Sequence, residues 1–131
     1  MAALFKEIRI ETSPERVWDA VRDVGALHTR LVPGFVVDTK LDGETRIVTF
    51  GNGMVVREPI LSCDDARRRL AWSAQGGRAT HYNAVLEVTG EDAAARVRWT
   101  TDLLPHELAD TLGAMQEQGL AVMKRTLENG G

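Results

Sequence analysis

Two oppositely charged residues, Arg46 and Glu58, form the pair in this sequence that is best placed for chemistry. The turn Gly51-Asn52-Gly53 separates two strand-like segments and pairs Phe50 with Met54. In that register Arg46 lies directly opposite Glu58, on the same face of the hairpin. If this face is buried, the two charges must bind each other or a polar group of a ligand, because an unpaired buried charge is costly. Glu58 could then act as a general acid or base, and Arg46 could hold a carboxylate or an enolate. The alternative is an ion pair that satisfies only itself.

Aromatic and flexible side chains supply the other candidate contacts. Tyr82 carries a phenol that could hydrogen-bond a ligand, although a buried tyrosine often finds only a protein partner. Trp72 and Trp99 could stack on a flat ligand or belong to the core, and Met115 suits an adaptable wall. Gly119 interrupts a predicted helix at a cost of about 1 kcal/mol against alanine, which indicates either close packing or room for a ligand. We predict that the following residues line a ligand site: Phe50, Ile60, Trp72, Tyr82, Leu86, Trp99, Met115 and Gly119.

The histidines and the single cysteine do not form a recognisable metal or catalytic motif. The segment His106-Glu107-Leu108-Ala109-Asp110 begins like a zinc-protease motif, but Asp110 stands where the second histidine is required. No phosphate-binding loop, dinucleotide fingerprint or nucleophile elbow is present. Cys63 is the only cysteine and therefore excludes an internal disulfide. We expect neither a metal ion nor another cofactor.

Composition narrows the class of protein further. The chain has 131 residues, 44% of them hydrophobic, and a net charge of −3, which is typical of a single globular domain over residues 1–131. The run Arg67-Arg68-Arg69 is too small a basic surface for nucleic acid, so no nucleic-acid partner is expected. No apolar run approaches the ~20 residues that span a bilayer, and the charges at Lys6 and Glu7 come too early for a signal peptide. We expect a cytoplasmic location without membrane insertion.

Strands occupy most of the chain and have to position the candidate side chains. Alternating apolar residues, separated by glycine-rich or acidic turns, indicate a meander of hairpins, in which neighbouring strands are antiparallel. The predicted strands lie near residues 4–11, 35–41, 45–50, 54–63, 69–75, 79–89 and 95–103.

Three helices complete the predicted architecture. Ser13 is a good N-cap and Pro14 a good first residue for a helix that runs to about Asp23, and a short helix near 26–31 follows. A helix of about 24 residues begins at Pro105, and its ~36 Å length could cross the whole sheet. Residues at steps of three and four predict its inward stripe, with Gln118 beside Gly119: Leu108, Leu112, Met115, Gly119, Val122 and Thr126, widened by Leu120, Met123 and Leu127.

The second face of the hairpin is less polar than a solvent-exposed face usually is. It carries Val55, Pro59 and Leu61, which would form an apolar patch on the outside of the sheet. Such a patch could be a surface for association, so a homodimer is one expectation for this chain. An interaction protein that works through this face is therefore one of the functions to be weighed.

The predicted order of one strand, two short helices, six strands and a long helix resembles the helix-grip fold of the START-like (SRPBCC) superfamily. Within it, the chain resembles the polyketide cyclase/dehydrase and lipid-transport family. The resemblance rests on four segments: Ser13-Pro14-Glu15-Arg16-Val17-Trp18-Asp19-Ala20-Val21, Arg57-Glu58-Pro59-Ile60, Arg69-Leu70-Ala71-Trp72 and Arg96-Val97-Arg98-Trp99. It implies an α+β fold in which a seven-stranded antiparallel sheet wraps around the C-terminal helix and leaves a deep hydrophobic cavity, with Glu58 and Trp72 pointing into it.

Three functions are compatible with these patterns. The first is binding of a small hydrophobic or aromatic, lipid-like ligand in the cavity, which the apolar inward face favours. The second is a cyclase or dehydratase that uses Glu58 together with Arg46 and Tyr82, since the family that the chain resembles includes aromatic cyclases as well as lipid and hormone carriers. The third is association through the outer sheet face. Fold alone does not decide among them.

Overall fold

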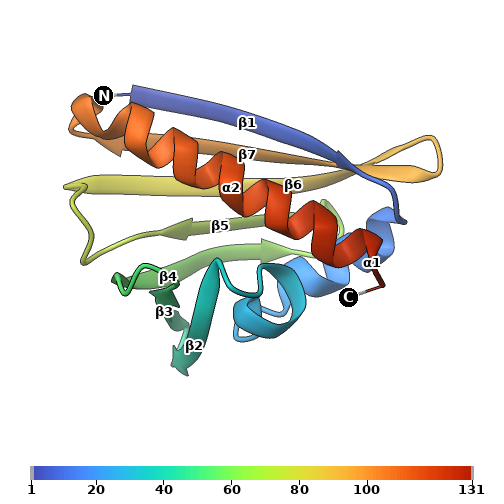
Figure 1. Ribbon diagram of the computed structural model, residues 1–131, viewed down its shortest axis with the longest axis horizontal. Helices are drawn as coiled ribbons and strands as arrows, with labels where there is room; N and C mark the ends of the chain where they lie inside the picture. The colour runs from blue at the N-terminus through green and yellow to red at the C-terminus, as the bar shows by residue number, and fades with distance from the viewer. Residues whose placement is uncertain (1, 131) are drawn as a thin grey trace.

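A seven-stranded sheet curves around one long helix in the computed structural model, which describes residues 2–130 (Figure 1). The α+β class, the helix-grip architecture and the order of the elements agree with the sequence-based prediction. In chain order the elements are β1 (Ala2–Ile10), α1 (Pro14–Arg22), the π-helical turn η1 (Leu27–Leu31), β2 (Val36–Asp42), β3 (Thr45–Phe50), β4 (Val55–Asp64), β5 (Arg69–Ser73), β6 (His81–Glu91), β7 (Ala94–Leu104), the 3-10 turn η2 (His106–Leu108) and α2 (Ala109–Glu128).

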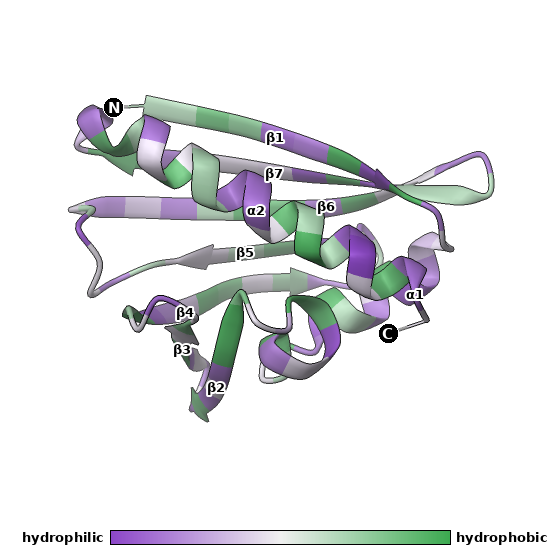
Figure 2. Cartoon of the chain, in the orientation of Figure 1, coloured by the Kyte–Doolittle hydropathy of each residue, from purple (hydrophilic) through white to green (hydrophobic). Residues whose placement is uncertain are grey.

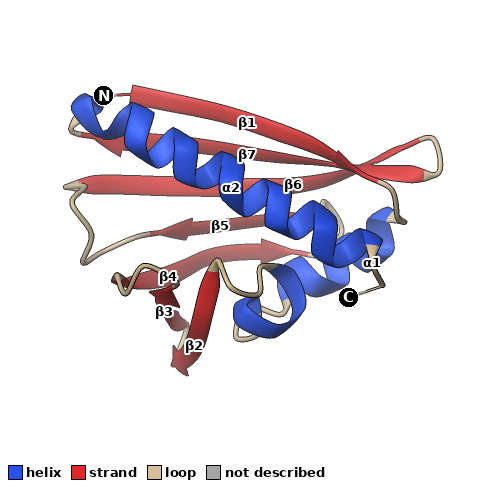
Figure 3. Ribbon diagram, in the orientation of Figure 1, coloured by secondary structure: helices blue, strands red, loops and turns tan. Residues whose placement is uncertain are grey.

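The strands follow one another as hairpins, except at the first connection. The order across the sheet is β1-β7-β6-β5-β4-β3-β2, and every neighbouring pair is antiparallel. The segment with α1 and η1 leads from β1 at one edge to β2 at the other (Figure 3). α2 crosses the sheet diagonally and its last turns lie near α1 (Figure 3).

The helix ends follow from local sequence. The Ser13 side chain accepts a hydrogen bond of 3.2 Å from the Arg16 backbone N–H, and Pro14 is the first residue of α1, as predicted. The C-terminal helix begins later than predicted, because Pro105 has an extended backbone (φ −75°, ψ 154°) and a 3-10 turn follows it. α2 therefore has 20 residues. The Asn129 and Gly130 backbone N–H groups donate to carbonyls of its last turn, which confirms the predicted helix end.

Strand register is as predicted at the β3–β4 hairpin and irregular beyond it. Val48 pairs with Val56 and Arg46 with Glu58. A bulge follows between Ile60 and Ser62, before β4 continues along β5. Such an extra residue changes which side chains of the second half of β4 face inward.

Burial along α2 agrees with the predicted stripe at Gly119, Leu120, Met123 and Leu127 and differs from it at Gly113 and Gln116. Its buried residues are Gly113, Gln116, Gly119, Leu120, Met123 and Leu127. Gln118, which was expected beside Gly119 on the inward side, is exposed, and Gln116 is buried in its place. Figure 2 shows hydrophilic residues recurring between the hydrophobic ones along this helix.

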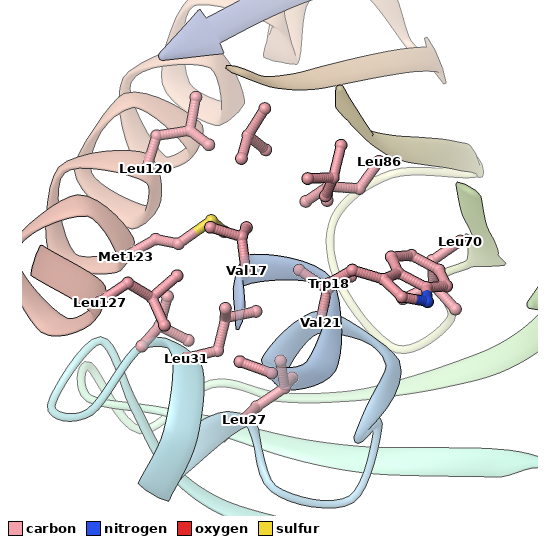
Figure 4. Close-up of a cluster of buried hydrophobic side chains, with 14 of the residues drawn as sticks. Val17, Trp18, Val21, Leu27, Leu31, Leu70, Leu86, Leu120, Met123 and Leu127 are labelled. Carbon is pink, nitrogen blue, oxygen red and sulfur yellow. The ribbon is translucent and has the colours of Figure 1, made fainter. Parts of the chain in front are cut away.

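One end of the interface between sheet and helices is filled by side chains. There α1 contributes Val17 and Trp18 to the same hydrophobic core as Leu120 and Leu127 of the later turns of α2 (Figure 4). The Trp18 indole N–H donates a hydrogen bond of 2.9 Å to Asp65 in the β4–β5 turn. This packed end fixes α1 and α2 against the sheet.

Candidate functional site

A cavity of about 310 Å³ lies between the sheet and the first half of α2. Of the predicted lining residues, the structure brings the following together in its wall: Phe50, Trp72, Tyr82, Leu86, Trp99, Met115 and Gly119. Ile60 is not part of this wall. It pairs with Trp72 and therefore shares the inward face, but it is partly buried against the core and does not border the cavity.

The cavity reaches the surface where three segments meet. Solvent-exposed lining residues come from the β3–β4 turn (Asn52), the β5–β6 loop (Gly77 and Arg78) and the first turns of α2 (Thr111). At the opposite, inner end the lining residues are buried and include Val21, Leu27, Leu31 and Met123. The cavity therefore opens beside the start of α2 and extends toward α1.

Arg46 and Glu58 form a buried pair in the wall of this cavity. The Arg46 Nε donates a hydrogen bond of 2.7 Å to Glu58 Oε1, and the two side chains are only 3% and 9% exposed. The guanidinium also lies 5.1 Å from the centre of the Trp72 ring, in the range of a cation–π contact. Burial raises the pKa of Glu58, and the neighbouring Arg46 only partly opposes this effect.

The Arg46–Glu58 pair leaves some of its own hydrogen-bonding groups without a partner. Arg46 Nη1 is buried and has no hydrogen-bond partner within residues 2–130. Among the described residues, the Glu58 carboxyl group receives a single hydrogen bond, on Oε1. Because both residues line the cavity, a polar group of a ligand could bind Arg46, and a carboxyl with a raised pKa could exchange a proton there. The interpretation as a self-contained ion pair is therefore incomplete.

A second polar group in the wall joins β6, β7 and α2. Gln116 Nε2 donates to the Tyr82 hydroxyl oxygen at 3.0 Å and to Thr101 Oγ1 at 2.9 Å. Burial raises the pKa of Tyr82 to about 12, so its phenol is neutral at physiological pH. The sequence analysis missed Gln116 as a cavity residue. Its position three residues before Gly119 and seven before Met123 places it on their helix face and could have revealed it.

Aromatic rings form much of the remaining wall of the cavity. The rings of Trp72 and Trp99 are 5.9 Å apart and tilted by 53°, and Phe35 meets Phe50 edge to face at 5.6 Å. A Cβ atom on Gly119 would lie 3.2 Å from the Phe35 ring and 3.4 Å from the Trp99 ring. Gly119 thus serves close packing of two rings against the helix, while it also lines the cavity.

The other candidate features lie outside this cavity. Among residues 2–130 no cluster of three or more His, Cys, Asp or Glu side chains could hold a metal ion. His106 is exposed and lies beside Glu107, while His28 and His81 are partly buried elsewhere. In the part of the chain that the structure describes, no helix combines the length and the apolar character needed to cross a membrane.

The outer face of β4 exposes part of the predicted apolar patch. Val55 is 50% and Leu61 56% exposed, whereas Pro59 is partly buried. These side chains are accessible for association. The homodimer stays a prediction that sedimentation velocity at several protein concentrations would test, and a monomer at all of them would contradict it.

Solved structures share this fold at low sequence identity. The protein XoxI from Bacillus cereus is 21% identical, with a TM-score of 0.86 over 100% of this chain and 99% of that one. A START superfamily protein from Mycobacterium smegmatis is 12% identical, with a TM-score of 0.74 over 97% and 94% of the two chains. The di-domain ARO/CYC BexL from the BE-7585A biosynthetic pathway is 18% identical, with a TM-score of 0.83 over 98% of this chain and 47% of BexL. These likenesses confirm the START-type helix-grip fold.

Sequence comparison gives a more specific result than structural similarity alone. No curated protein matches the chain in sequence. The family model described as polyketide cyclase/dehydrase and lipid transport, however, matches residues 1–128, which is nearly the whole chain. The chain therefore belongs to the polyketide cyclase/dehydrase and lipid-transport family.

Proposed function

We propose that the protein binds a small hydrophobic or aromatic, lipid-like molecule in the cavity between the sheet and α2. The observation that carries this proposal is the cavity itself, whose volume of about 310 Å³ equals that of about ten water molecules. Ligand sites typically begin near this size and combine apolar walls with a few polar groups. The Trp72 and Trp99 rings offer flat surfaces, and the Arg46–Glu58 pair offers polarity.

Family membership supports the same proposal. The family description includes lipid transport, and the START superfamily protein from Mycobacterium smegmatis has the same fold. The volume favours a ligand with one or two rings, or a short aliphatic chain, over a lipid with two long chains.

Calorimetric titration with naphthalene, a flat apolar probe, tests this proposal. We expect saturable binding to the wild-type protein. Met115→Trp should weaken it strongly, because Met115 lines the cavity and the larger ring would occupy the space. Ala114→Trp is the matched control, since Ala114 is the exposed neighbour on the same helix. Absence of saturable binding by naphthalene and by a broad set of apolar compounds would contradict the proposal.

An enzymatic role is the second candidate, and the position of Glu58 favours it. Glu58 lines the cavity, receives one hydrogen bond and has a raised pKa, so its carboxylate would be a stronger base than one in water. In such a cyclisation, Glu58 would take a proton from a carbon between two carbonyl groups while Arg46 holds the enolate oxygen. The carbon would then bond to another carbonyl of the substrate, whose oxygen would take the proton back from Glu58 and become a hydroxyl. Glu58 would next remove the remaining hydrogen of the same carbon as a proton and pass it to that hydroxyl, which would leave as water while the carbon–carbon double bond forms.

Two observations connect this second candidate with an experiment. The family description includes cyclases and dehydrases, and BexL is described as an ARO/CYC. Incubation with a set of linear poly-β-ketone thioesters, followed by mass spectrometry, would reveal loss of water from a substrate. Glu58→Gln should abolish the reaction in a variant that still unfolds cooperatively. A product that forms equally with wild type and Glu58→Gln would exclude Glu58 as the base.

A further inference from the structure

We propose that Tyr82, Trp99 and Gln116 form a second polar subsite in the cavity, which binds a hydroxyl group of an uncharged ring compound. This inference rests on the proposed binding function and specifies its ligand. The three residues come from β6, β7 and α2, and all of them line the cavity. They lie apart from the Arg46–Glu58 pair, which belongs to β3 and β4.

The first observation is a buried amide with one unused end. Gln116 is only 3% exposed, and Nε2 donates its two hydrogen bonds to Tyr82 and Thr101. Gln116 Oε1 is buried and has no partner within residues 2–130. An unpartnered buried carbonyl oxygen destabilises a protein, so its position in a cavity wall indicates a partner that arrives from outside the chain.

The second observation is a set of unused donors in the same part of the wall. Trp99 Nε1 is also buried and lies near the Tyr82 oxygen, but it makes no hydrogen bond of good geometry within the described residues. The Tyr82 oxygen accepts from Gln116, which leaves the Tyr82 hydroxyl hydrogen free to donate. The subsite therefore presents an acceptor together with two donors.

The combination of acceptor and donors selects among ligand groups. A hydroxyl group both donates and accepts, so it can donate to Gln116 Oε1 while it accepts from Trp99 or Tyr82. A ketone or an ether only accepts and would leave Gln116 Oε1 unpaired. A carboxylate would place negative charge beside the same carbonyl oxygen. The complementary group is thus a neutral hydroxyl.

The position of the subsite suggests how the body of the ligand lies. Glu58 is on β4 and Tyr82 on β6, two strand spacings or ~10 Å apart at the backbone. Trp72 on the intervening β5 contacts the Arg46 guanidinium on one side and lies next to Trp99 on the other. A body of one or two rings along the Trp72 and Trp99 rings would reach from the hydroxyl subsite toward the charged pair.

Three probes of similar size separate the hydroxyl subsite from general apolar binding. We would titrate wild-type protein calorimetrically with naphthalene, 2-naphthol and 2-methoxynaphthalene. Two hydrogen bonds to buried groups should make 2-naphthol bind about tenfold more tightly than naphthalene. The methoxy compound cannot donate and should lose most of this advantage. In Gln116→Leu the preference for 2-naphthol should fall toward onefold, whereas Gln118→Leu, an exposed site on the same helix, should retain it.

The outcomes distinguish this inference from the proposed function. Equal affinity of wild type for naphthalene and 2-naphthol would overturn the hydroxyl subsite and leave the apolar binding site standing. A methoxy compound that binds as tightly as 2-naphthol would also overturn it, because donation to Gln116 would then play no part. If none of the three probes binds, both proposals fail. The comparison of probes on wild-type protein decides these points even if Gln116→Leu does not fold.

Discussion

The two ends of the interface between the sheet and α2 are built differently. At the end where α2 finishes, α1 inserts Val17 between the sheet and the helix, and Leu120 and Leu127 are almost fully buried (Figure 4). At the end where α2 begins, Met115 and Gly119 face a cavity of about 310 Å³. The first region, the packed end, stabilises the fold, and the second, the hollow end, leaves surface available for a ligand.

The two ends also differ in how fully their polar groups are hydrogen-bonded. At the packed end, Asp65 accepts hydrogen bonds from both Trp18 and Arg22. Five side-chain atoms are buried without a partner in the described chain: three lie at the hollow end, on Arg46, Trp99 and Gln116, and the other two are His28 Nδ1 in η1 and Thr39 Oγ1 in β2. Because buried polar groups are normally paired, the three at the hollow end support the proposal that a ligand binds there.

Removal of Arg46 should have the largest effect on stability. Arg46→Met leaves Glu58 buried without the guanidinium that donates to it, and loss of one partner of a buried ion pair typically costs about 3–5 kcal/mol. Urea unfolding at neutral pH measures this loss, and the double variant with Glu58→Leu should recover most of it. Arg67→Met is the surface control, since the Arg67 side chain is 78% exposed in its ion pair with Asp64. Equal losses in Arg46→Met and Arg67→Met would show that the cavity pair is effectively solvated.

Truncation of one apolar residue at each end tests the difference in packing directly. Leu120→Ala at the packed end should cost about 2–5 kcal/mol, because the surrounding side chains cannot close the gap. Met115→Ala at the hollow end should cost less than about 1 kcal/mol, since its side chain already borders empty space. Chemical denaturation of both variants gives the two values, and comparable losses would contradict the distinction.

The pH dependence of stability should have opposite signs at the two ends. Burial raises the pKa of Glu58 above its ordinary 4.5, so its contribution is fully present below pH 4.5 and is lost as pH rises through the raised pKa. Hydrogen bonds from Arg22 and Trp18 lower the pKa of Asp65, so its contribution is present above its ordinary 3.8 and is lost as pH falls through the lowered pKa.

Two neutral variants isolate these contributions. The free energy of unfolding of wild type relative to Glu58→Gln should fall as pH rises above 4.5. Relative to Asp65→Asn, it should fall as pH drops below 3.8. Urea titrations across both ranges measure the slopes, and two slopes of the same sign would refute the assignment of the two environments.

The glycines of α2 should give the smallest effects. A Cβ atom on Gly113 would lie in ordinary contact, 3.5 Å from the Lys6 side chain, so Gly113→Ala should stabilise the protein by up to about 1 kcal/mol. In Gly119→Ala the Phe35 and Trp99 rings must move, which should offset that gain and narrow the cavity. Thermal unfolding and naphthalene titration of both variants check this. A Gly119→Ala variant that is stabilised as much as Gly113→Ala, with unchanged binding, would show that the rings do not close on the helix.

Local patterns explain which parts of this structure could be predicted from sequence. The register of Arg46 opposite Glu58 follows from alternation and from one short turn, both of which are local. Alternation shows which side chains face inward but not which of them border the cavity, and Ile60, which shares the face of Trp72, packs against the core instead. Gln116 was missed because a stripe that is read from apolar residues does not include a polar side chain at the same helical spacing.

Contacts between distant elements explain what sequence could not supply. The role of Asp65 does not follow from its neighbours in sequence, because its partners Trp18 and Arg22 lie more than 40 residues away in the chain. The Gln116 network likewise joins side chains from three elements. Side chains with such partners look like ordinary polar residues until the fold brings them together.

Nuclear magnetic resonance titration with naphthalene tests the central claim most directly, because backbone amide shifts report on both ends at once. The account predicts saturable changes concentrated at residues around the cavity, such as Trp72, Trp99 and Met115, with Val17 and Leu127 at the packed end changing little. No saturable change, or changes equally large at Val17 and Leu127, would contradict the account that the hollow end is a ligand-binding site.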